Sequence, residues 1–324
     1  MNSDEQYRLF LSLFYPVFSI MALLVQILIL FMIWKYTPKT MSIFRFILAL
    51  TSVCQLILLF ICFVCQFRMI SNGIPVELRS YGIVRYMKPY IGYTMHQGYQ
   101  FFMFMSGMSI MVTFYFKFAQ VYNKRLTKLT MSGTFLVFHI PVIISGVVEM
   151  FMIATQALPQ EIRDKYEAMS IDNSVYSVVG ALSLQTLPSR INFFLMVGSV
   201  FSYPIIGFYY RHRILIVLNS LQSGTSKTRK IQYREFTTGL TIQAVLPGIC
   251  YIPVFSLYVF CILTKEEVLF QQYFMYITPT LPVFLDPLVI IYFIAPYRNR
   301  VMYWIGLRTK QQIMAVSASV VIMT

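Results

Sequence analysis

Charged side chains are scarce in this chain. Asp, Glu, Lys and Arg together make up 12% of its 324 residues, whereas soluble domains carry about 25% charged residues. Hydrophobic residues make up 58%, which leaves too little polar surface to keep a chain of this length in solution. The composition therefore argues against a soluble globular protein and favours a membrane protein.

Cysteines are few, and none lies where a disulfide could tie the longer connecting segments to the third apolar stretch. All five fall in or at the ends of two apolar stretches: Cys54, Cys62, Cys65, Cys250 and Cys261. Cys62 and Cys65 form a C-x-x-C pattern, but inside an apolar helix this pattern favours packing over redox or metal chemistry. The sequence also has no N-x-S/T sequon, so N-glycosylation is not expected.

Catalytic motifs are also missing. The sequence contains no H-E-x-x-H, no G-x-S-x-G and no P-loop, which are patterns that place reactive groups at fixed spacing. Its three histidines, His96, His139 and His212, are scattered and lack the spacing of metal ligands. Enzymatic activity, a cofactor and a bound metal are therefore not expected.

Seven long apolar stretches account for most of the chain. They span residues 9–34, 46–65, 98–116, 132–155, 191–210, 237–262 and 272–295. Each has about 20 residues or more, the length that a helix needs to cross the hydrocarbon core of a bilayer. We expect an all-α membrane protein, a single domain over residues 1–324 with seven transmembrane helices. The first stretch is too long for a cleavable signal and should remain in the membrane.

Basic residues are distributed unevenly over the connecting segments. The segments after the first, third, fifth and seventh stretches hold most of the 26 Lys and Arg residues. Because cytoplasmic segments are enriched in these residues, we expect the N-terminus outside and the tail 296–324 in the cytoplasm. One basic group lies on the other side: Arg68, Arg79, Arg85 and Lys88. Placement at the ends of apolar stretches favours topology and lipid contact over nucleic-acid binding.

The segment 296–307 differs from the stretches before it. It mixes Arg298 and Arg300 with Tyr297, Tyr303 and Trp304. This mixture of basic and aromatic residues predicts a short amphipathic helix on the inner membrane face.

Several residues in the sixth and seventh stretches are candidates for a conformational switch. Asp286 precedes Pro287 in an apolar stretch, and ionisable groups inside a membrane are costly and usually functional. It is either a switch or a structural hydrogen-bonding group. Pro247 and Pro253 can act as pivots or simply shape the bundle. Gln243 is expected to bond to backbone that Pro247 leaves unpaired.

Four polar residues lie near the expected outer ends of two stretches. His96, Gln97 and Gln100 cluster where the third stretch begins, and they either line an outer pocket or are solvated in the entry segment. Glu149 lies near the outer end of the fourth stretch, where it either touches a ligand or reaches the membrane interface. These four are the candidate ligand-binding residues.

A second group of candidates lies on the expected cytoplasmic side. Lys117 ends the third stretch, where it either contacts a partner or snorkels to the interface. The segment of about residues 211–234 is the most basic part of the chain. The candidates for contact with a cytoplasmic partner are Lys117, Arg211, Arg213, Lys227, Arg229 and Lys230.

Four motifs are spread over nearly the whole chain. They are Lys35-Tyr36-Thr37-Pro38-Lys39-Thr40-Met41, Gln66-Phe67-Arg68-Met69-Ile70, Gln243-Ala244-Val245-Leu246-Pro247, and Leu285-Asp286-Pro287-Leu288 with Pro296-Tyr297-Arg298 after it. In these motifs the chain resembles the nematode seven-transmembrane chemoreceptors, particularly the serpentine receptor class delta (Srd) family. Two positions depart from the family pattern. Lys117 stands where the family tends to have arginine, and the segment 81–86 lacks a cysteine expected nearby.

The resemblance implies a GPCR-like bundle and a G-protein-coupled chemosensory receptor in the plasma membrane, usually of sensory neurons. It implies two partners, a small-molecule ligand and a heterotrimeric G protein. We expect the ligand between the outer halves of the third, fifth, sixth and seventh helices. A seven-helix channel or transporter, and a receptor-like chain without signalling of its own, are the alternatives.

Overall fold

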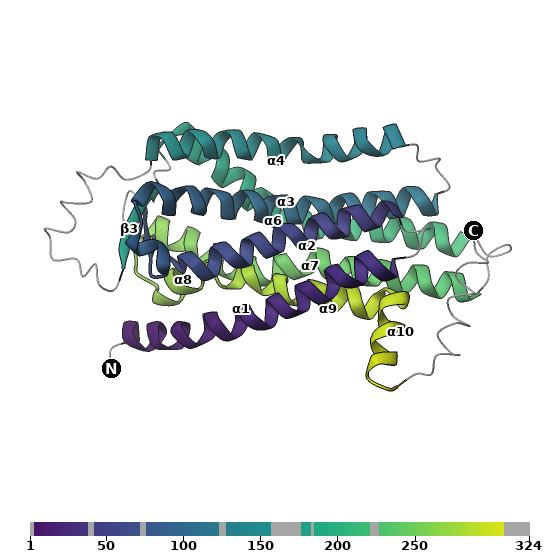
Figure 1. The fold of residues 1–324 in the computed structure, drawn as a ribbon. Coiled ribbons are helices and arrows are strands. Elements are labelled where there is room, and N and C mark those ends of the chain that lie inside the picture. Colours follow the sequence, from purple (N-terminus) through teal and green to yellow (C-terminus); the bar gives the residue numbers. More distant parts are fainter. Residues whose placement is uncertain are drawn as a thin grey trace, which may run out of the picture.

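The computed structural model describes residues 3–37, 42–71, 76–122, 128–156, 176–182, 185–220 and 227–307. Within these residues, seven helices are long and apolar enough to cross a membrane. They pack side by side into one elongated bundle (Figure 1). The first six crossings are α1 Ser3–Tyr36, α2 Ser42–Cys65, α3 Pro89–Val121, α4 Lys128–Gln156, α6 Leu187–Ser220 and α7 Lys227–Thr264. The predicted seven-helix bundle is confirmed.

The six helices are longer than the apolar stretches that predicted them. Helix α3 begins at Pro89, nine residues before the expected start at 98. Proline is favoured in the first turn of a helix, where its missing N–H would have no partner. His96 and Gln97 therefore lie inside a helix and are buried. The interpretation that they are solvated in an entry segment is wrong.

The seventh crossing is broken. It consists of α8 Leu269–Phe274, a turn, the 3₁₀ helix η3 Thr278–Thr280 and α9 Leu281–Phe293. Pro279 and Pro282 lie just after the turn, and each removes a backbone donor. Side chains bond to backbone at the break, because the carbonyl of Tyr276 accepts a hydrogen bond from the Tyr99 hydroxyl at 3.3 Å. An irregular segment at membrane depth is tolerated when it is buried in protein in this way.

Helix α3 is the centre of the bundle. It contacts α2, α4, α6 and α7, and it has the most buried apolar window of the seven crossings. Gly107 of α3 lies directly against the ring of Tyr203 of α6, where an added Cβ would collide with the ring. A small residue lets the two helices approach closely.

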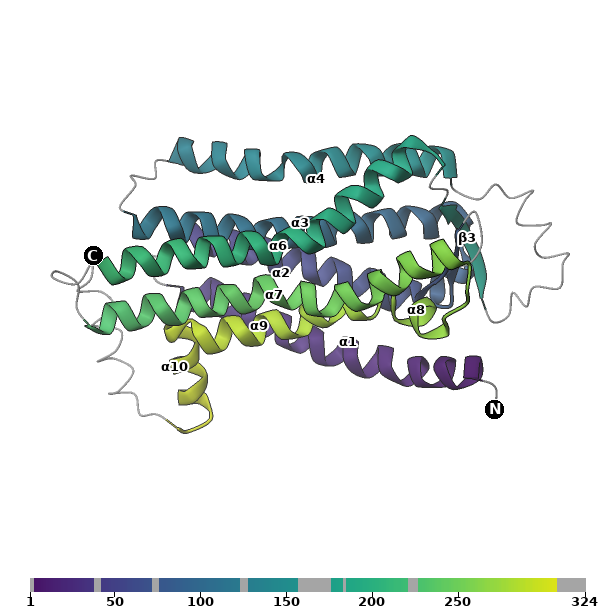
Figure 2. The same ribbon diagram turned by 180° about the vertical axis from the view of Figure 1, so that it is seen from behind.

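A three-stranded antiparallel sheet covers one end of the bundle (Figure 2). Its strands are β1 Phe67–Ile70, β2 Val76–Ser80 and β3 Ser177–Leu182, in that order. Val76 and Leu78 of β2 are buried and alternate with half-buried residues, which is the period-two pattern of a strand with one face on a core. These three short strands lie between the second and third crossings and between the fourth and fifth, and they add a small sheet to the helical bundle at this end. We call this the sheet end.

Arg68 of β1 joins the sheet to two helices. Its Nη1 donates to the hydroxyls of Tyr81 and Tyr273 at 2.9 and 2.7 Å and lies 2.9 Å from Asp4 Oδ1 of α1. Its Nε and Nη2 donate to Gln272 Oε1 of α8 at 3.0 and 2.6 Å. Arg68 is 5% exposed, so its charge is held inside the protein by these groups.

The opposite end of the bundle carries α10 Ala295–Trp304, and we call it the α10 end. This helix runs across the bundle axis (Figure 1) and fits the predicted short helix after the seventh crossing. Trp304 packs on Tyr36 of α1 with ring centroids 6.0 Å apart. The Tyr297 hydroxyl lies 2.7 Å from Thr37 Oγ1, and burial raises the pKa of Tyr297 to about 12, which keeps the hydroxyl protonated. The tail beyond residue 307 lies outside the described residues.

Candidate functional site

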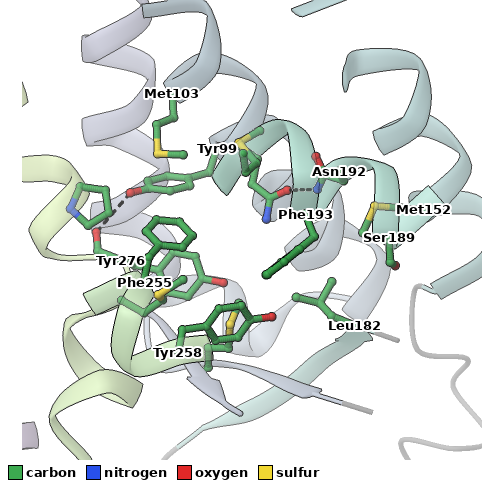
Figure 3. Close-up of a pocket in the computed structure, with 15 residues that line it drawn as sticks. Tyr99, Met103, Met152, Leu182, Ser189, Asn192, Phe193, Phe255, Tyr258 and Tyr276 are labelled. Carbon is green, nitrogen blue, oxygen red and sulfur yellow. Dashed lines mark hydrogen bonds between the residues drawn. The ribbon is translucent and has the colours of Figure 1, made fainter. Parts of the chain in front are cut away.

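A cavity lies between α3, α6, α7 and the broken seventh crossing, directly beneath the sheet (Figure 3). Its volume is about 70 Å³. The residues that line it are Met69, Tyr99, Gln100, Met103, Met152, Leu182, Ser189, Asn192, Phe193, Met196, Phe255, Tyr258, Met275, Tyr276 and Pro279. Met69 belongs to β1 and Leu182 to β3, so the sheet forms the end wall of the cavity.

The wall of the cavity is mostly aromatic rings and thioethers. Tyr99, Phe193, Phe255 and Tyr258 project toward one another across it (Figure 3). Five methionines add flexible, polarisable side chains that adapt to irregular shapes. Such a wall, with a few placed polar groups, is typical of small-molecule sites.

Three polar residues of the cavity wall, Gln100, Asn192 and Tyr276, belong to one chain of hydrogen bonds. Asn192 Nδ2 lies 2.5 Å from Gln100 Oε1, and Gln100 Nε2 lies 3.4 Å from His96 Nε2. His96 Nε2 lies 2.7 Å from the Tyr276 hydroxyl, and His96 Nδ1 lies 3.3 Å from Gln97 Nε2. The chain runs from α6 through α3 to the seventh crossing. It places Gln100 on the wall and His96 and Gln97 behind it.

Glu149 lies apart from this cavity. It is 3% exposed, and Ser145 Oγ donates a hydrogen bond of 2.9 Å to its Oε1. Met152, three residues further along α4, lines the cavity, and Glu149 does not. Its burial also contradicts the alternative that Glu149 reaches the membrane interface.

A larger hollow of about 440 Å³ lies between the start of α1 and the sheet. Arg8, Arg68 and Arg85 line it together with Glu5. Arg8 and Arg68 both pair with Asp4, at 3.4 and 2.9 Å. Arg68 and Arg85, two members of the basic group at residues 68–88, thus lie at the sheet end, where Arg68 pairs with Asp4. The hollow is lined by three arginines and Glu5, whereas the wall of the cavity beneath the sheet is mostly apolar.

Asp286 of α9 lies at the end of a second polar chain, deeper in the bundle. It is 1% exposed, and Gln55 Nε2 of α2 donates to its Oδ2 at 2.6 Å. Gln26 Nε2 of α1 donates to Gln55 Oε1 at 2.8 Å and to the carbonyl of Val283 at 2.7 Å. Asp286 Oδ1 has no hydrogen-bond partner among the described residues. Three helices therefore meet at this carboxyl group.

Asp286 also borders a narrow cavity that adjoins the one beneath the sheet. Tyr203, Pro247, Tyr251 and Asp286 line it. Met103 and Pro279 line both cavities. The cavity beneath the sheet and the narrow cavity at Asp286 thus have part of their walls in common.

The other switch candidates are spread along α7 and α9. Pro247 and Pro253 lie inside a continuous α7, and Pro287 lies inside α9. Gln243 is buried and lines a small cavity with Gly239 and Ile290 near the α10 end. The structure brings Pro247 next to Asp286 but leaves Gln243 apart from it.

The basic candidates at the α10 end occupy different environments. Lys117 is 5% exposed; its Nζ lies 4.7 Å above the ring of Phe236 and 3.3 Å from Gln120 Oε1. This burial does not fit snorkelling of Lys117 to the membrane interface, and contact of Lys117 with a partner stays a prediction. Arg213 is exposed and Arg211 half-buried. The side chains of Lys227, Arg229 and Lys230 lie outside the described residues.

Sequence reasoning missed several residues of the two polar chains. Asn192 and Tyr276 are single polar groups in apolar stretches, and nothing in their sequence neighbourhood marks them. A bond between helices could have been predicted for Gln26 and Gln55, because an amide inside a membrane helix needs a partner in a neighbouring helix. The two residues lie 29 positions apart, and their pairing depends on the packing of α1 and α2.

The seven long apolar helices define a multi-pass membrane protein built on a seven-helix bundle. The family model described as "Serpentine type 7TM GPCR chemoreceptor Srd" matches residues 11–303. The chain belongs to this family, as its motifs predicted. It is 45% identical to serpentine receptor class delta-40 of Caenorhabditis elegans, over 97% of this chain and 98% of the relative. It is 35% identical to serpentine receptor class delta-45 of the same organism, over 96% and 97%. The family consists of chemoreceptors and not of enzymes, as the missing catalytic motifs predicted.

Proposed function

We propose that the chain binds a small chemical cue in the cavity beneath the sheet and signals to a heterotrimeric G protein at the α10 end. The observation that carries this proposal is the adjacency of two cavities, one apolar and closed by the sheet, the other bordered by Asp286. A molecule that alters Met103 or Pro279 acts on both cavities at once. The ligand would thereby favour one of two arrangements of the helices.

Asp286 is the proposed switch. A carboxyl group in hydrocarbon must be hydrogen-bonded, protonated or paired with a cation. Only one of its oxygens has a hydrogen-bond partner in the described part of the chain. The neighbouring Pro287 weakens the helix at this point because it cannot donate a backbone hydrogen bond. Two arrangements of α9 against α2 can therefore differ little in free energy.

The proposed G-protein surface lies at the α10 end and combines Lys117 with the basic segment that follows α6. In the present arrangement Lys117 is covered by Phe236 of α7. Opening α7 away from α3 would uncover this charge. The positive charges of the segment after α6 would then form a basic rim that steers an acidic partner. These charges are Arg211, Arg213, Lys227, Arg229 and Lys230.

The proposed orientation has the sheet end outside the cell and the α10 end in the cytoplasm. The distribution of basic residues supports it, and the proposed site is the plasma membrane of a sensory neuron. A tag on each end of the full chain tests the orientation by staining of intact cells. We expect the N-terminal tag to stain without permeabilisation, and a C-terminal tag that stains under the same conditions would overturn the proposal.

The function is tested by applying a panel of small volatile and water-soluble chemicals to cells that express the chain. Second messengers and membrane current are recorded together. A second-messenger response that a G-protein inhibitor abolishes supports the proposal. A current that persists under the inhibitor supports a channel instead. Binding without either response identifies a receptor-like chain that does not signal alone.

A further inference from the structure

The hollow at the sheet end has the size of a small-molecule site. Its volume is about 440 Å³, and ligand pockets measure about 300–1,000 Å³. Its walls come from the first turns of α1, from β1, from α8 and from the 3₁₀ helix η2 Ile83–Tyr86. None of the described residues that line it also lines the cavity beneath the sheet. The hollow is thus a second candidate site, separate from the one in the proposed function.

One face of α1 forms a wall of the hollow. Arg8, Leu11, Ser12 and Tyr15 all line it, and their spacing places them on a single face of the helix. Leu11 and Tyr15 are buried, whereas Ser12 is exposed and Arg8 is half-buried. The wall is therefore charged at the start of the helix and more apolar further along. Such a gradient fits a molecule with a charged head and an apolar body.

Positive charge exceeds negative charge around the hollow. Arg8, Arg68 and Arg85 line it together with Glu5. Asp4 pairs with Arg8 and Arg68 at 3.4 and 2.9 Å. Counted over these five residues, three arginines and two carboxylates leave one positive charge. A charge that is withdrawn from water is costly unless it is paired, so the hollow favours a ligand with one negative charge.

Arg8 is the arginine with donors to spare. Arg68 already donates to three side chains and pairs with Asp4. Within the described part of the chain, the one polar partner of Arg8 is Asp4, through Nε at 3.4 Å. The side chain of Arg8 is 35% exposed, and its Nη1 and Nη2 donate to none of the described residues. These two nitrogens form a planar fork that matches a carboxylate or a phosphate.

Arg8 also lies at the level of the lipid head groups. Along α1 it is about 40 Å from Lys35, at 1.5 Å per residue. A bilayer with its head groups is about 40–45 Å thick, so Arg8 and Lys35 reach the head groups of opposite leaflets. Leu9 lines the hollow and is 56% exposed, and Leu13 and Val17 continue the same exposed stripe along α1. The hollow therefore adjoins the lipid.

We propose that the hollow binds an amphiphile that has one anionic head group, a carboxylate or a phosphodiester, on an apolar chain. The Nη1–H and Nη2–H groups of Arg8 hold the head group, and the chain lies along α1 past Leu9 and Leu13. Two sources share this chemistry, a free fatty acid and an anionic phospholipid of the bilayer. The site goes beyond the proposed function and does not depend on it.

The probes are two matched pairs, dodecanoate with dodecanol and phosphatidylglycerol with phosphatidylcholine. Within each pair the chains are the same and the net charge of the head group differs. The full chain in an uncharged detergent is titrated with each probe, and native mass spectrometry counts the molecules that it binds. We expect the first dodecanoate to bind about tenfold more tightly than the first dodecanol, because the alcohol cannot form charge-assisted bonds to Arg8.

Three variants separate binding in the hollow from general attraction to a basic protein. Arg8→Gln removes the fork at a partly exposed position and should bring the ratio within each pair close to one. Ser12→Trp keeps every charge but fills the hollow, and should weaken the binding of dodecanoate about tenfold. Arg79→Gln is the matched control, because it removes one charge at the sheet end from a residue that pairs with Glu77 and does not line the hollow. It should keep the wild-type ratio.

The outcomes decide both the site and the source of its occupant. A preference for the anions that is lost in Arg8→Gln and Ser12→Trp and kept in Arg79→Gln supports the site. If phosphatidylglycerol follows this pattern, the occupant is a bilayer lipid; if only dodecanoate does, it is a free amphiphile. Equal binding of charged and uncharged probes overturns the proposal. A preference that survives Arg8→Gln or Ser12→Trp, or that Arg79→Gln reduces as strongly, also overturns it.

Discussion

The two ends of the bundle are held together by different kinds of contact. At the sheet end, Arg68 bonds to groups of α1, the sheet and α8, and three strands pair across segments far apart in the sequence. At the α10 end, α7 is held by the packing of Phe236 and by one partly exposed ion pair, Glu235 with Arg298 at 3.1 Å. A buried, fully bonded charge resists separation, whereas a partly exposed pair contributes little. The contacts of Arg68 at the sheet end thus resist separation more strongly than the Glu235–Arg298 pair at the α10 end does.

The largest expected effect follows from breaking the Arg68 cluster. Arg68→Met removes the donor to Gln272 Oε1 and leaves Asp4 with Arg8 as its remaining ion-pair partner. Loss of one member of a buried charged cluster costs about 3–5 kcal/mol of folding free energy. Thermal unfolding of the purified chain in detergent measures the loss. Arg79→Gln is the control, since Arg79 pairs with Glu77 at a partly exposed position and should cost no more than about 1 kcal/mol. Equal losses in the two variants would remove the distinction between the ends.

The next largest effect is expected at Asp286, which lies in the bundle between the two ends. Asp286→Ala removes the carboxyl group that Gln55 binds. The variant protein should therefore lose its response to ligand or change its resting activity. Asp286→Asn keeps the shape and a hydrogen-bonding group and should be milder. Surface density is measured beside the response in both variants. A response that falls only in proportion to surface density would show that Asp286 is structural.

A smaller effect is expected at the basic rim of the α10 end. Neutralising Lys227, Arg229 and Lys230 together should weaken G-protein activation by roughly tenfold, since each exposed charge contributes about 0.2–1 kcal/mol. Ligand binding, measured on the same membranes, should not change. Normal surface level with unchanged signalling would indicate that these charges serve topology or lipid contact alone.

The smallest effect is expected at the ion pair between Glu235 and Arg298. Glu235→Gln and Arg298→Gln each remove the bond between α7 and α10 and should raise resting activity by up to about fivefold, the equivalent of about 1 kcal/mol. The double variant should equal either single one, because both remove the same contact. Glu266→Gln, at an exposed position of the sheet end, is the control. Additive effects of the two changes would rule out the pair as a shared restraint.

The sequence predicted the parts of this structure that depend on local chemistry. Seven apolar stretches of bilayer length leave a helical bundle as the main solution, because each backbone group must be paired inside the segment. The sheet was missed because β3 lies about 100 residues after β2, and four to six residues of alternation are a weak signal by themselves. The break at residues 275–277 was missed because the apolar stretch 272–295 runs through it without interruption, and prolines such as Pro279 and Pro282 also occur inside continuous helices.

The candidate site was predicted in part. Gln100 lines the cavity and His96 stands behind it, since polar residues near the start of a membrane helix favour an outer site. Glu149 is buried but outside the cavity, because the face that a residue presents depends on how α4 packs. Asn192 and Tyr276 become site residues only through the positions of α6 and the seventh crossing, which no local pattern determines.

The sheet that closes the cavity is assembled without a disulfide bond. All five cysteines are free, and they belong to α2 and α7. Oxidative folding is therefore not a requirement for this lid, and reducing agents should leave it intact. The receptor is accordingly suited to production in cell-free extracts or other reducing systems, where extracellular domains that depend on disulfides are lost.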